Sequence, residues 1–183
     1  MKINNLDELN TPCLILDKNI LEKNCNKARE KCRELNTTLR PHVKTPKSIE
    51  VAKIALGEEI GPITVSTLKE AEYFASAGFK DILYAVCIIP KKLEQLNFIQ
   101  KKYGCKIRIA IDSIYLAKEI SIFSKSYNAD LEVLIEIDCG EGRSGISFKD
   151  QNIIEISKVF DNCKHSKLIG VMSHAGHSYS TND

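Results

Sequence analysis

Short apolar runs alternate with longer amphipathic runs along the 183-residue chain, and this alternation predicts an α/β fold with parallel strands and outer helices. In the run KIRIAID (106–112) isoleucine recurs at alternate positions, so one face is apolar and the other is mixed. Such strands suit a barrel wall, in which helices cover one face and the other face turns inward. A complete TIM-type barrel has eight strands and about 250 residues, so the sequence predicts an incomplete (β/α) TIM-type barrel.

The predicted strands are short segments that are dominated by Val, Ile and Leu. They are expected at residues 11–17, 38–44, 62–67, 81–86, 106–111, 131–138 and 168–174. In the second of them, Arg40, His42 and Lys44 fall on one face, because side chains alternate along a strand. In the sixth, Glu136 and Asp138 share a face. Polar inner faces therefore recur from strand to strand, as a barrel interior allows.

Amphipathic segments between the strands predict the helices. They are expected at residues 19–35, 67–77, 90–103, 114–127 and 150–162. Thr67 with Glu70 three residues later forms a capping box, and Gly78 follows as the expected C-terminal cap. Pro90 suits the first turn of the third helix, where its missing N–H is not needed. No linker divides the chain, so we expect one domain over residues 1–183.

The composition argues against several function classes. The 26 basic and 24 acidic residues give a formal charge of +2, and the lysines are scattered, so no nucleic-acid partner is expected. No apolar stretch approaches the roughly 20 residues that span a bilayer, so no membrane partner is expected either. The seven cysteines form no C-x-x-C pair, and the N-terminus lacks an apolar signal core. A cytoplasmic protein with reduced cysteines is therefore predicted.

The segment Arg-Pro-His-Val-Lys-Thr at 40–45 is the first candidate for chemistry. It places three cationic or titratable side chains on one face at a strand end. Burying an unpaired charge costs several kcal/mol, so an interior cluster implies partners or a ligand. A partly desolvated Lys44 would lose some affinity for protons, and its neutral amine can attack a carbonyl. The alternative is a strand end that emerges into water, with the amine of Lys44 in solvent.

A glycine-rich segment, Asp-Cys-Gly-Glu-Gly-Arg-Ser-Gly at 138–145, leaves the sixth predicted strand. Its glycines let the backbone approach a ligand closely, and Arg143 offers a planar guanidinium for a phenolate or a carboxylate. The alternative is a flexible loop in which Asp138 accepts hydrogen bonds from local amides.

The segment Ser-His-Ala-Gly-His-Ser-Tyr at 173–179 supplies two histidines. The spacing of His174 and His177 would suit a metal, but no nearby carboxylate or cysteine completes a ligand set, so no metal site is predicted. His174 is a candidate for ring stacking or proton relay. Two loop histidines without such a role remain the alternative.

Polar residues fall near the C-terminal end of nearly every predicted strand. The set comprises Lys44, Thr64, Ser66, Tyr84, Asp112, Asp138 and His174. Active sites of (β/α) barrels lie on that face, so the coincidence across several strands predicts an enzyme.

Six motifs carry a resemblance to a known family. They are TPCLILD (11–17), LRPHVKTPKS (39–48), ITVSTLKEAE (63–72), ILYAV (82–86), IEIDCGEGRSGI (135–146) and SHAGHSY (173–179). In this order they resemble the D-threonine aldolase and D-serine dehydratase-like family, whose members have an alanine-racemase-type barrel of fold type III and use pyridoxal 5'-phosphate. The resemblance implies the N-terminal part of such an enzyme, a truncated barrel that lacks the last barrel strands and the C-terminal β-domain.

The resemblance also implies roles for single residues. Lys44, in PHVKT, matches the lysine that holds the cofactor as a Schiff base, and it is the expected catalytic residue together with His174. Arg143 matches the arginine near the cofactor ring oxygen or the substrate carboxylate, and His174 matches the position beside the pyridine ring. The expected cofactor-binding set is Lys44, His42, Arg143, Thr64, Tyr84 and His174.

The implied activity is that of a pyridoxal-phosphate-dependent lyase acting on small D-amino acids with a β-hydroxyl group, by carbon–carbon cleavage or by dehydration. A homodimer is implied for the full-length protein, as is a divalent metal whose ligands are not in this chain. Pro46 stands where family members commonly have His, which changes the loop after Lys44. A racemase of the same barrel class, a pyridoxal-phosphate-binding homeostasis protein and a non-functional remnant remain as alternatives.

Overall fold

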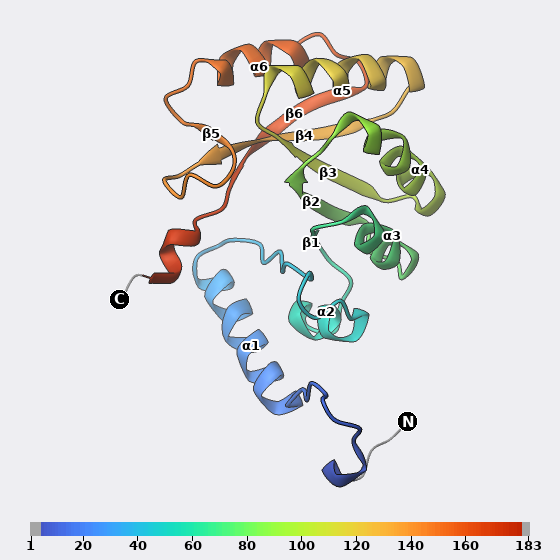
Figure 1. Cartoon of the computed structure of the whole chain (residues 1–183), viewed down its shortest axis with the longest axis vertical. Helices are drawn as coiled ribbons and strands as arrows, with labels where there is room; N and C mark the ends of the chain where they lie inside the picture. Colours follow the sequence, from blue (N-terminus) through green and yellow to red (C-terminus); the bar gives the residue numbers. More distant parts are fainter. Residues whose placement is uncertain (1–4, 181–183) are drawn as a thin grey trace.

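The computed structural model describes residues 5–180 and has one parallel sheet with helices along one of its faces (Figure 1). The helices are α1 (Lys18–Glu34), α2 (Ile49–Leu56), α3 (Leu68–Ser76), α4 (Leu93–Tyr103), α5 (Ile114–Tyr127) and α6 (Asn152–Phe160). The strands are β1 (Ile63–Val65), β2 (Asp81–Cys87), β3 (Lys106–Ile111), β4 (Leu131–Asp138), β5 (Ile146–Ser147) and β6 (Ser166–Ser173). Three short 3-10 helices are η1 (Leu6–Glu8), η2 (Pro90–Lys92) and η3 (Gly176–Ser180).

Every strand pair in the sheet is parallel. The strands run in the order β1, β2, β3, β4, with β6 on β4, and the short β5 pairs with the last two residues of β4. Within residues 5–180 no further strand pairs with β6, so the barrel wall is not closed. The prediction of an incomplete (β/α) barrel with parallel strands and outer helices is confirmed.

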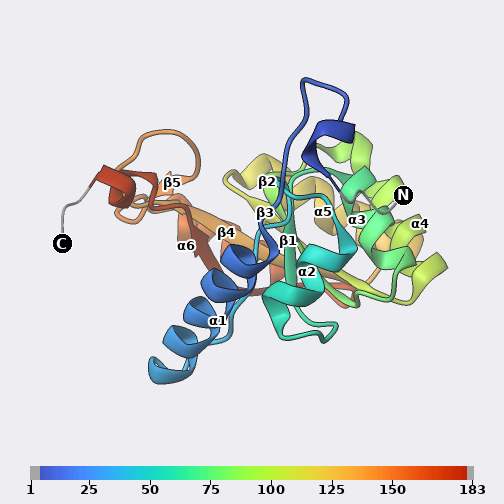
Figure 2. The ribbon, with the colours of Figure 1, turned by 90° about the horizontal axis from the view of Figure 1, so that it is seen from below.

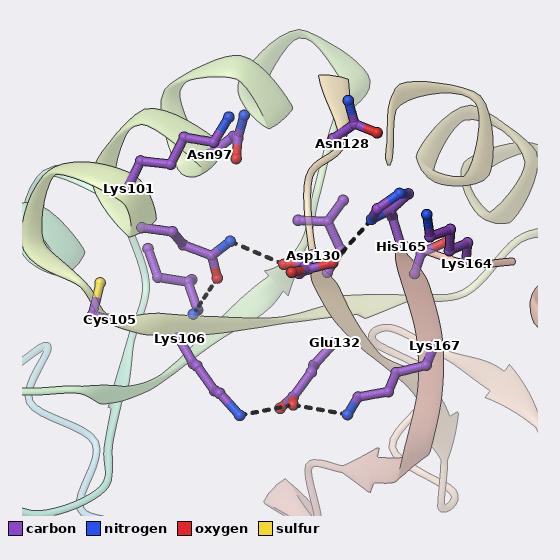
Figure 3. A pocket seen from close by; sticks show the side chains of 14 residues that line it. Asn97, Lys101, Cys105, Lys106, Asn128, Asp130, Glu132, Lys164, His165 and Lys167 are labelled. Carbon is purple, nitrogen blue, oxygen red and sulfur yellow. Dashed lines mark hydrogen bonds and ion pairs between the residues drawn. The ribbon is translucent and has the colours of Figure 1, made fainter. Parts of the chain in front are cut away.

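The inner face of the sheet carries a ladder of alternating charges near the amino ends of the strands. Asp81 pairs with Arg40 at 2.7 Å and also with Arg108, whose Nε lies 3.0 Å from Glu132 Oε2. Lys167 of β6 reaches the other oxygen of Glu132 at 3.3 Å (Figure 3). Burial alone would raise the pKa of both carboxyls, but the neighbouring cations bring each pKa below its usual value. The polar inner face is therefore stabilised by ion pairs across neighbouring strands.

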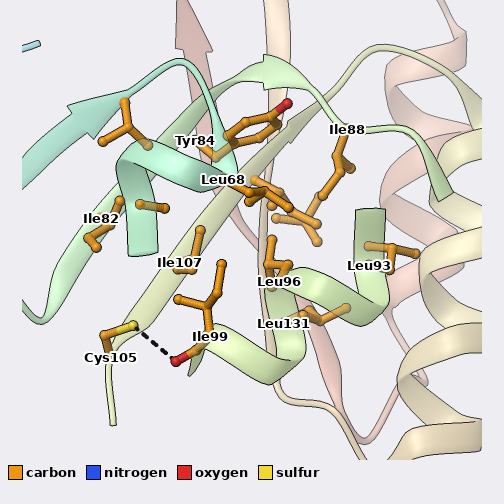
Figure 4. Close-up of a cluster of buried hydrophobic side chains, with 14 of the residues drawn as sticks. Leu68, Ile82, Tyr84, Ile88, Leu93, Leu96, Ile99, Cys105, Ile107 and Leu131 are labelled. Carbon is orange, nitrogen blue, oxygen red and sulfur yellow. Dashed lines mark hydrogen bonds between the residues drawn. The ribbon is translucent and has the colours of Figure 1, made fainter. Parts of the chain in front are cut away.

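The outer face holds the hydrophobic core. Alternate residues of β1 to β4, such as Ile82, Ile107 and Leu131, are almost fully buried against helices α3 and α4, where Leu68 and Leu96 lie (Figure 4). Each such side chain contributes about 1.5–3 kcal/mol relative to an exposed one. The alternation seen in the sequence thus sorts apolar residues under the helices and polar residues toward the barrel interior.

Helix ends follow the predicted signals. The Oγ1 of Thr67 accepts a hydrogen bond from the N–H of Glu70 at 3.0 Å, as expected of a helix that starts there. The segment expected to be a helix at 90–103 begins as the 3-10 turn η2 and continues as α4. The predictions for 19–35, 114–127 and 150–162 are confirmed by α1, α5 and α6.

Two predicted strands are wrong or reduced. Residues 11–17 form no strand, and Leu14 is 103% exposed, because within residues 5–180 no neighbouring strand supplies hydrogen-bond partners for this apolar run. Residues 38–44 make only a parallel bridge between His42 and Thr64. Pro41 has no N–H to donate, and the chain turns away at once, since Lys47 N donates to Val43 O at 3.0 Å.

Helix α2 was not predicted, although its signals are present. The Oγ of Ser48 accepts from the N–H of Val51 at 3.2 Å, and Gly57 ends the helix. Its short length and its β-branched residues obscured the helical period. Helix α1 lies against α2 and away from the sheet (Figures 1 and 2), with Arg29 donating to the carbonyl of Ile54 at 2.6 Å. Among residues 5–180, no helix has both the length and the apolar character needed to cross a bilayer.

Candidate active site

The residues predicted to carry chemistry gather where the inner face of the sheet meets the carboxyl ends of its strands. His42 bridges to Thr64 of β1, Asp138 ends β4, and His174 follows β6. Since the carboxyl ends of parallel strands share one edge, segments distant in the sequence meet there. The edge is the one on which (β/α) barrels build their active sites.

His42 is held by hydrogen bonds at both ring nitrogens. The backbone N–H of Lys44 donates to Nδ1 at 3.3 Å, and Nε2 lies 3.2 Å from Ser66 Oγ. Because Nδ1 accepts, the neutral ring carries its proton on Nε2 and donates to Ser66. Ser66 is held in turn, since its N–H donates to Glu70 Oε2 at 2.9 Å. The start of α3 therefore fixes the orientation of the imidazole through Ser66.

The electrostatic surroundings keep His42 neutral. Burial lowers its pKa from the ordinary value of 6.5, and the positive charge of Lys44 lowers it further. The charge of His174 acts in the same direction, whereas the carboxylate of Glu70 opposes the shift. His174 therefore lies close enough to His42 to interact with it electrostatically.

Lys44 occupies a tight turn at 43–46 and is exposed. Among residues 5–180, no carboxylate lies within ion-pair distance of its amine, whereas the next lysine in the chain, Lys47, pairs with Glu70 at 3.4 Å. The sequence placed Lys44 at the end of a strand on the inner face. The structure places it in the turn that follows the bridge of His42, with an exposed side chain.

The loop after β4 is tied to the strand that it leaves. Asp138 Oδ1 accepts hydrogen bonds from the N–H groups of Gly140 and Gly142 at 2.9 and 3.1 Å, and these bonds lower the pKa of Asp138. Gly145 has a φ of +88° and packs directly on the strand backbone. A Cβ at this position would lie 2.8 Å from Glu136 O and 2.8 Å from Asp138 N, so only glycine fits.

Glu136 anchors the far end of this loop, a role that the sequence did not reveal. The residue is 4% exposed, and its carboxylate accepts from Ser144 Oγ at 2.6 Å and from Cys87 Sγ at 3.4 Å. Burial raises the pKa of Cys87, and the charges of Asp112 and Glu136 raise it further, so this cysteine stays a thiol. The inner-face position of Glu136 was readable from the strand alternation, but its partner Ser144 lies in the loop and was not.

Glu141 links two of the predicted residues and was also missed. Its Oε1 lies 3.9 Å from Arg143 Nη1, and its Oε2 lies 3.9 Å from His174 Nε2. Cys139 donates to the carbonyl of His174 at 3.4 Å, so a second contact holds the two loops together. A side chain at Gly176 would overlap the Glu141 carboxylate, which shows how closely the two loops approach. Sequence spacing carried no sign of this meeting.

The structure brings together most of the predicted set but not all of it. His42, Lys44, Thr64 and His174 form one group, and Arg143 joins it through Glu141. Tyr84 lies apart: it is fully buried on the helix-covered face, and its hydroxyl accepts from Lys92 Nζ at 3.0 Å (Figure 4). The period of two along β2 accounts for this, because Asp81 points inward and residues 82 and 84 then point outward.

His177 lies in η3, and its electrostatic interaction with Asp138 adds to the lowering of the pKa of Asp138 by the loop amides. In the part of the chain that the structure describes, no group of three or more His, Cys, Asp or Glu side chains is arranged to hold a metal ion.

The group offers a free primary amine, two imidazoles, hydroxyls and a guanidinium at one edge of the sheet. An amine can bond covalently to an aldehyde, a neutral imidazole can stack on or hydrogen-bond to a flat ring, and a guanidinium binds a carboxylate or phenolate. This donor set fits a flat aldehyde cofactor and an amino-acid substrate.

Comparisons with known proteins place the chain among relatives of the same architecture. The family described as alanine racemase, N-terminal domain, matches residues 16–183. D-threo-3-hydroxyaspartate dehydratase of Delftia sp. (strain HT23) is 37% identical over 172 residues, which are 93% of this chain and 45% of that protein. D-serine dehydratase of Dictyostelium discoideum is 32% identical over 190 residues, covering 95% and 47%.

The solved structure of the Delftia dehydratase superposes with a TM-score of 0.90 at 36% identity, over 96% of this chain and 46% of that one. The chain therefore spans about half the length of the curated relatives that it matches.

Proposed function

The chain belongs to the family of alanine racemase N-terminal domains, and from this premise we propose that it is the cofactor-carrying part of a pyridoxal-phosphate-dependent lyase for D-amino acids with a β-hydroxyl group. The observation that carries the proposal is the unpaired amine of Lys44, which lies beside a neutral His42 at the carboxyl edge of a parallel sheet. The family uses pyridoxal phosphate, and the two relatives described above are dehydratases by name. Aldolases of comparable identity are also among the relatives, so the proposal covers both loss of water and cleavage of the carbon–carbon bond.

The residues that would hold the cofactor belong to the group around His42. Lys44 would bind its aldehyde carbon covalently, and Thr64, His42 and His174 would contact its ring. Tyr84 is not part of this proposal, because its side chain is buried in the hydrophobic core and its hydroxyl accepts a hydrogen bond from Lys92. When bound, pyridoxal phosphate supplies an electron sink that stabilises negative charge at the substrate α-carbon.

The chain's own residues would manage protons and orientation. Once the substrate amino group has replaced it on the cofactor, the released amine of Lys44 would be the base available to accept the α-proton, because Lys47 is engaged with Glu70. His174, whose Nε2 lies 3.9 Å from Glu141 Oε2, would donate a proton to the departing hydroxyl, which leaves as water. Arg143 is 56% exposed at its side chain and is loosely held by Glu141, so a substrate carboxylate can replace that contact with a shorter bidentate one.

The neutral state of His42 has a defined use in this scheme. A second positive charge beside Lys44 would favour the neutral amine but would also repel other cations at the site. With its proton on Nε2 and directed to Ser66, His42 instead presents an uncharged ring that fixes the backbone of Lys44. We infer that His42 is a positioning residue for the lysine.

The test is product analysis with the whole protein loaded with pyridoxal phosphate. D-threo-3-hydroxyaspartate, D-serine and D-threonine are offered separately, with their L-isomers as controls. A dehydratase releases ammonia and a 2-oxo acid, and an aldolase releases glycine and an aldehyde. We expect Lys44→Ala to abolish the product and Lys118→Ala, an exposed lysine of α5, to leave it unchanged. Absence of both product pairs, or unchanged turnover in Lys44→Ala, would overturn the proposal.

A further inference from the structure

A cavity lies at the edge of the sheet opposite the candidate active site, where β3, β4 and β6 begin (Figure 3). Its volume is about 470 Å³, within the usual range for sites that bind small molecules. One wall is the side of helix α4, and the other wall is formed by the segments that lead into β4 and β6. The proposed active site uses the carboxyl ends of the strands, so this cavity lies outside it.

The floor of the cavity is fixed by hydrogen bonds. Gln100 of α4 donates to the carbonyl of Asp130 at 3.2 Å and accepts from the N–H of Ile107 at 2.7 Å. The Asp130 carboxylate lies 3.1 Å from Nδ1 of His165, and Leu131 donates its N–H to the His165 carbonyl at 2.8 Å. Helix α4 and three strands are therefore joined around the cavity before any ligand enters, which lowers the entropy cost of binding.

Asn97 shows that this cavity offers an unused polar group. The residue is only 9% exposed and lines the cavity, and its side-chain amide makes no hydrogen bond within residues 5–180. No fully buried side-chain nitrogen or oxygen among residues 5–180 lacks a partner, so the amide of Asn97 is open to the cavity and available to a ligand. Its neighbour one turn along α4, Lys101, also lines the cavity (Figure 3). An amide donor and an ammonium group thus stand together on one wall.

The lining is positively charged. Four lysines line the cavity against two carboxylates, Asp130 and Glu132. Two of the lysines share the carboxylate of Glu132, whereas Lys101 and Lys164 have no ion-pair partner in the part of the chain that the structure describes. The uncompensated charge of about +2 is shared between the two walls, so the cavity has a positive potential that favours an anion.

We propose that this cavity is a binding site for a compact dianion, such as inorganic phosphate or a short dicarboxylate. The amide of Asn97 donates a hydrogen bond to one of its oxygens beside the ammonium group of Lys101 on the α4 wall, and Lys164 adds positive charge on the opposite wall. The site does not depend on the proposed lyase activity.

The test is isothermal titration calorimetry of the whole chain with inorganic phosphate and, separately, with malonate, at constant ionic strength set by sodium chloride. We expect saturable binding of at least one of the two dianions. The dianion that saturates at the lower concentration shows whether the site prefers a phosphate or a dicarboxylate. Lys101→Gln combined with Lys164→Gln should weaken binding by about tenfold or more, and Asn97→Ala by about threefold to tenfold.

Lys69→Gln combined with Lys118→Gln is the matched control, because it removes the same charge from exposed positions outside the cavity. It should leave the affinity unchanged. An equal loss of dianion affinity in both double variants would show that only the overall charge matters, and it would overturn the proposed site. Absence of saturable heat with either dianion up to about 10 mM would also overturn it. Thermal unfolding of each variant checks its fold, and the exposed lysine changes keep the test valid if Asn97→Ala does not fold.

Discussion

Gly145 provides a quantitative test of how the loop after β4 is built. Replacing it with alanine puts a Cβ at 2.8 Å from two backbone atoms, Glu136 O and Asp138 N. Neither atom can move without breaking the pairing of β4. The φ of +88° adds about 1–2 kcal/mol for a residue with a side chain, and overpacking against the backbone adds about 1–3 kcal/mol. We therefore expect Gly145→Ala to lower the free energy of unfolding by about 2–5 kcal/mol.

Gly142 supplies the matched control. It lies in the same loop with a φ of +69°, and a Cβ there meets nothing within 4 Å. Gly142→Ala should thus lose only the backbone part, about 1–2 kcal/mol. Urea unfolding followed by far-UV circular dichroism measures both variants against the parent chain. Equal losses in the two variants would mean that the loop does not pack on β4 as described, and the account of how Arg143 is placed would fail with it.

Three further predictions concern the contacts around the sheet. The pKa of His42 is lowered in the folded state, so its contribution to the free energy of unfolding is complete above pH 6.5 and is lost as the pH falls through the folded-state pKa. His42→Asn should therefore flatten the fall in the free energy of unfolding between about pH 7 and about pH 5. Parallel curves of unfolding free energy against pH for the variant and the parent chain would contradict this. Glu132→Gln leaves Lys106 and Lys167 without a counter-charge and Arg108 with Asp81 alone, so it should cost about 1–3 kcal/mol in urea unfolding. Glu155→Gln breaks an exposed pair and should cost under about 0.5 kcal/mol, and similar losses in the two variants would show that the ladder contributes no more than a surface pair. Ser144→Ala should lose about 1 kcal/mol and increase hydrogen exchange in the 139–145 loop, and unchanged exchange would show that the bond to Glu136 does not hold the loop.

The strand alternation carried most of what the sequence could predict about the fold. Isoleucines at every second position of β3 marked the helix-covered face, and this face proved to hold the core. The prediction of a strand around Leu14 was wrong, because an apolar run becomes a strand only when a neighbouring strand pairs with it. The same alternation, read through Asp81, would have placed Tyr84 outward and removed it from the expected site.

The grouping of the candidate site residues could be predicted where single segments carry them and could not be predicted where two loops meet. Lys44, His42 and Thr64 lie in adjacent segments, and their strand-end positions marked them. The approach of Glu141 to His174 depends on two long loops folding over the same edge, which no local pattern encodes. The relay from His42 through Ser66 to Glu70 required the helix start as well as the strand end.

The central claim is that the amine of Lys44 holds the cofactor, and covalent mapping tests it most directly. The chain is mixed with pyridoxal phosphate, reduced with borohydride and analysed by peptide mass spectrometry. We predict that the label concentrates on Lys44, that Lys44→Arg lowers incorporation to the level of the scattered surface lysines, and that Lys118→Arg leaves it unchanged. A label spread evenly over exposed lysines, with no loss in Lys44→Arg, would contradict the account.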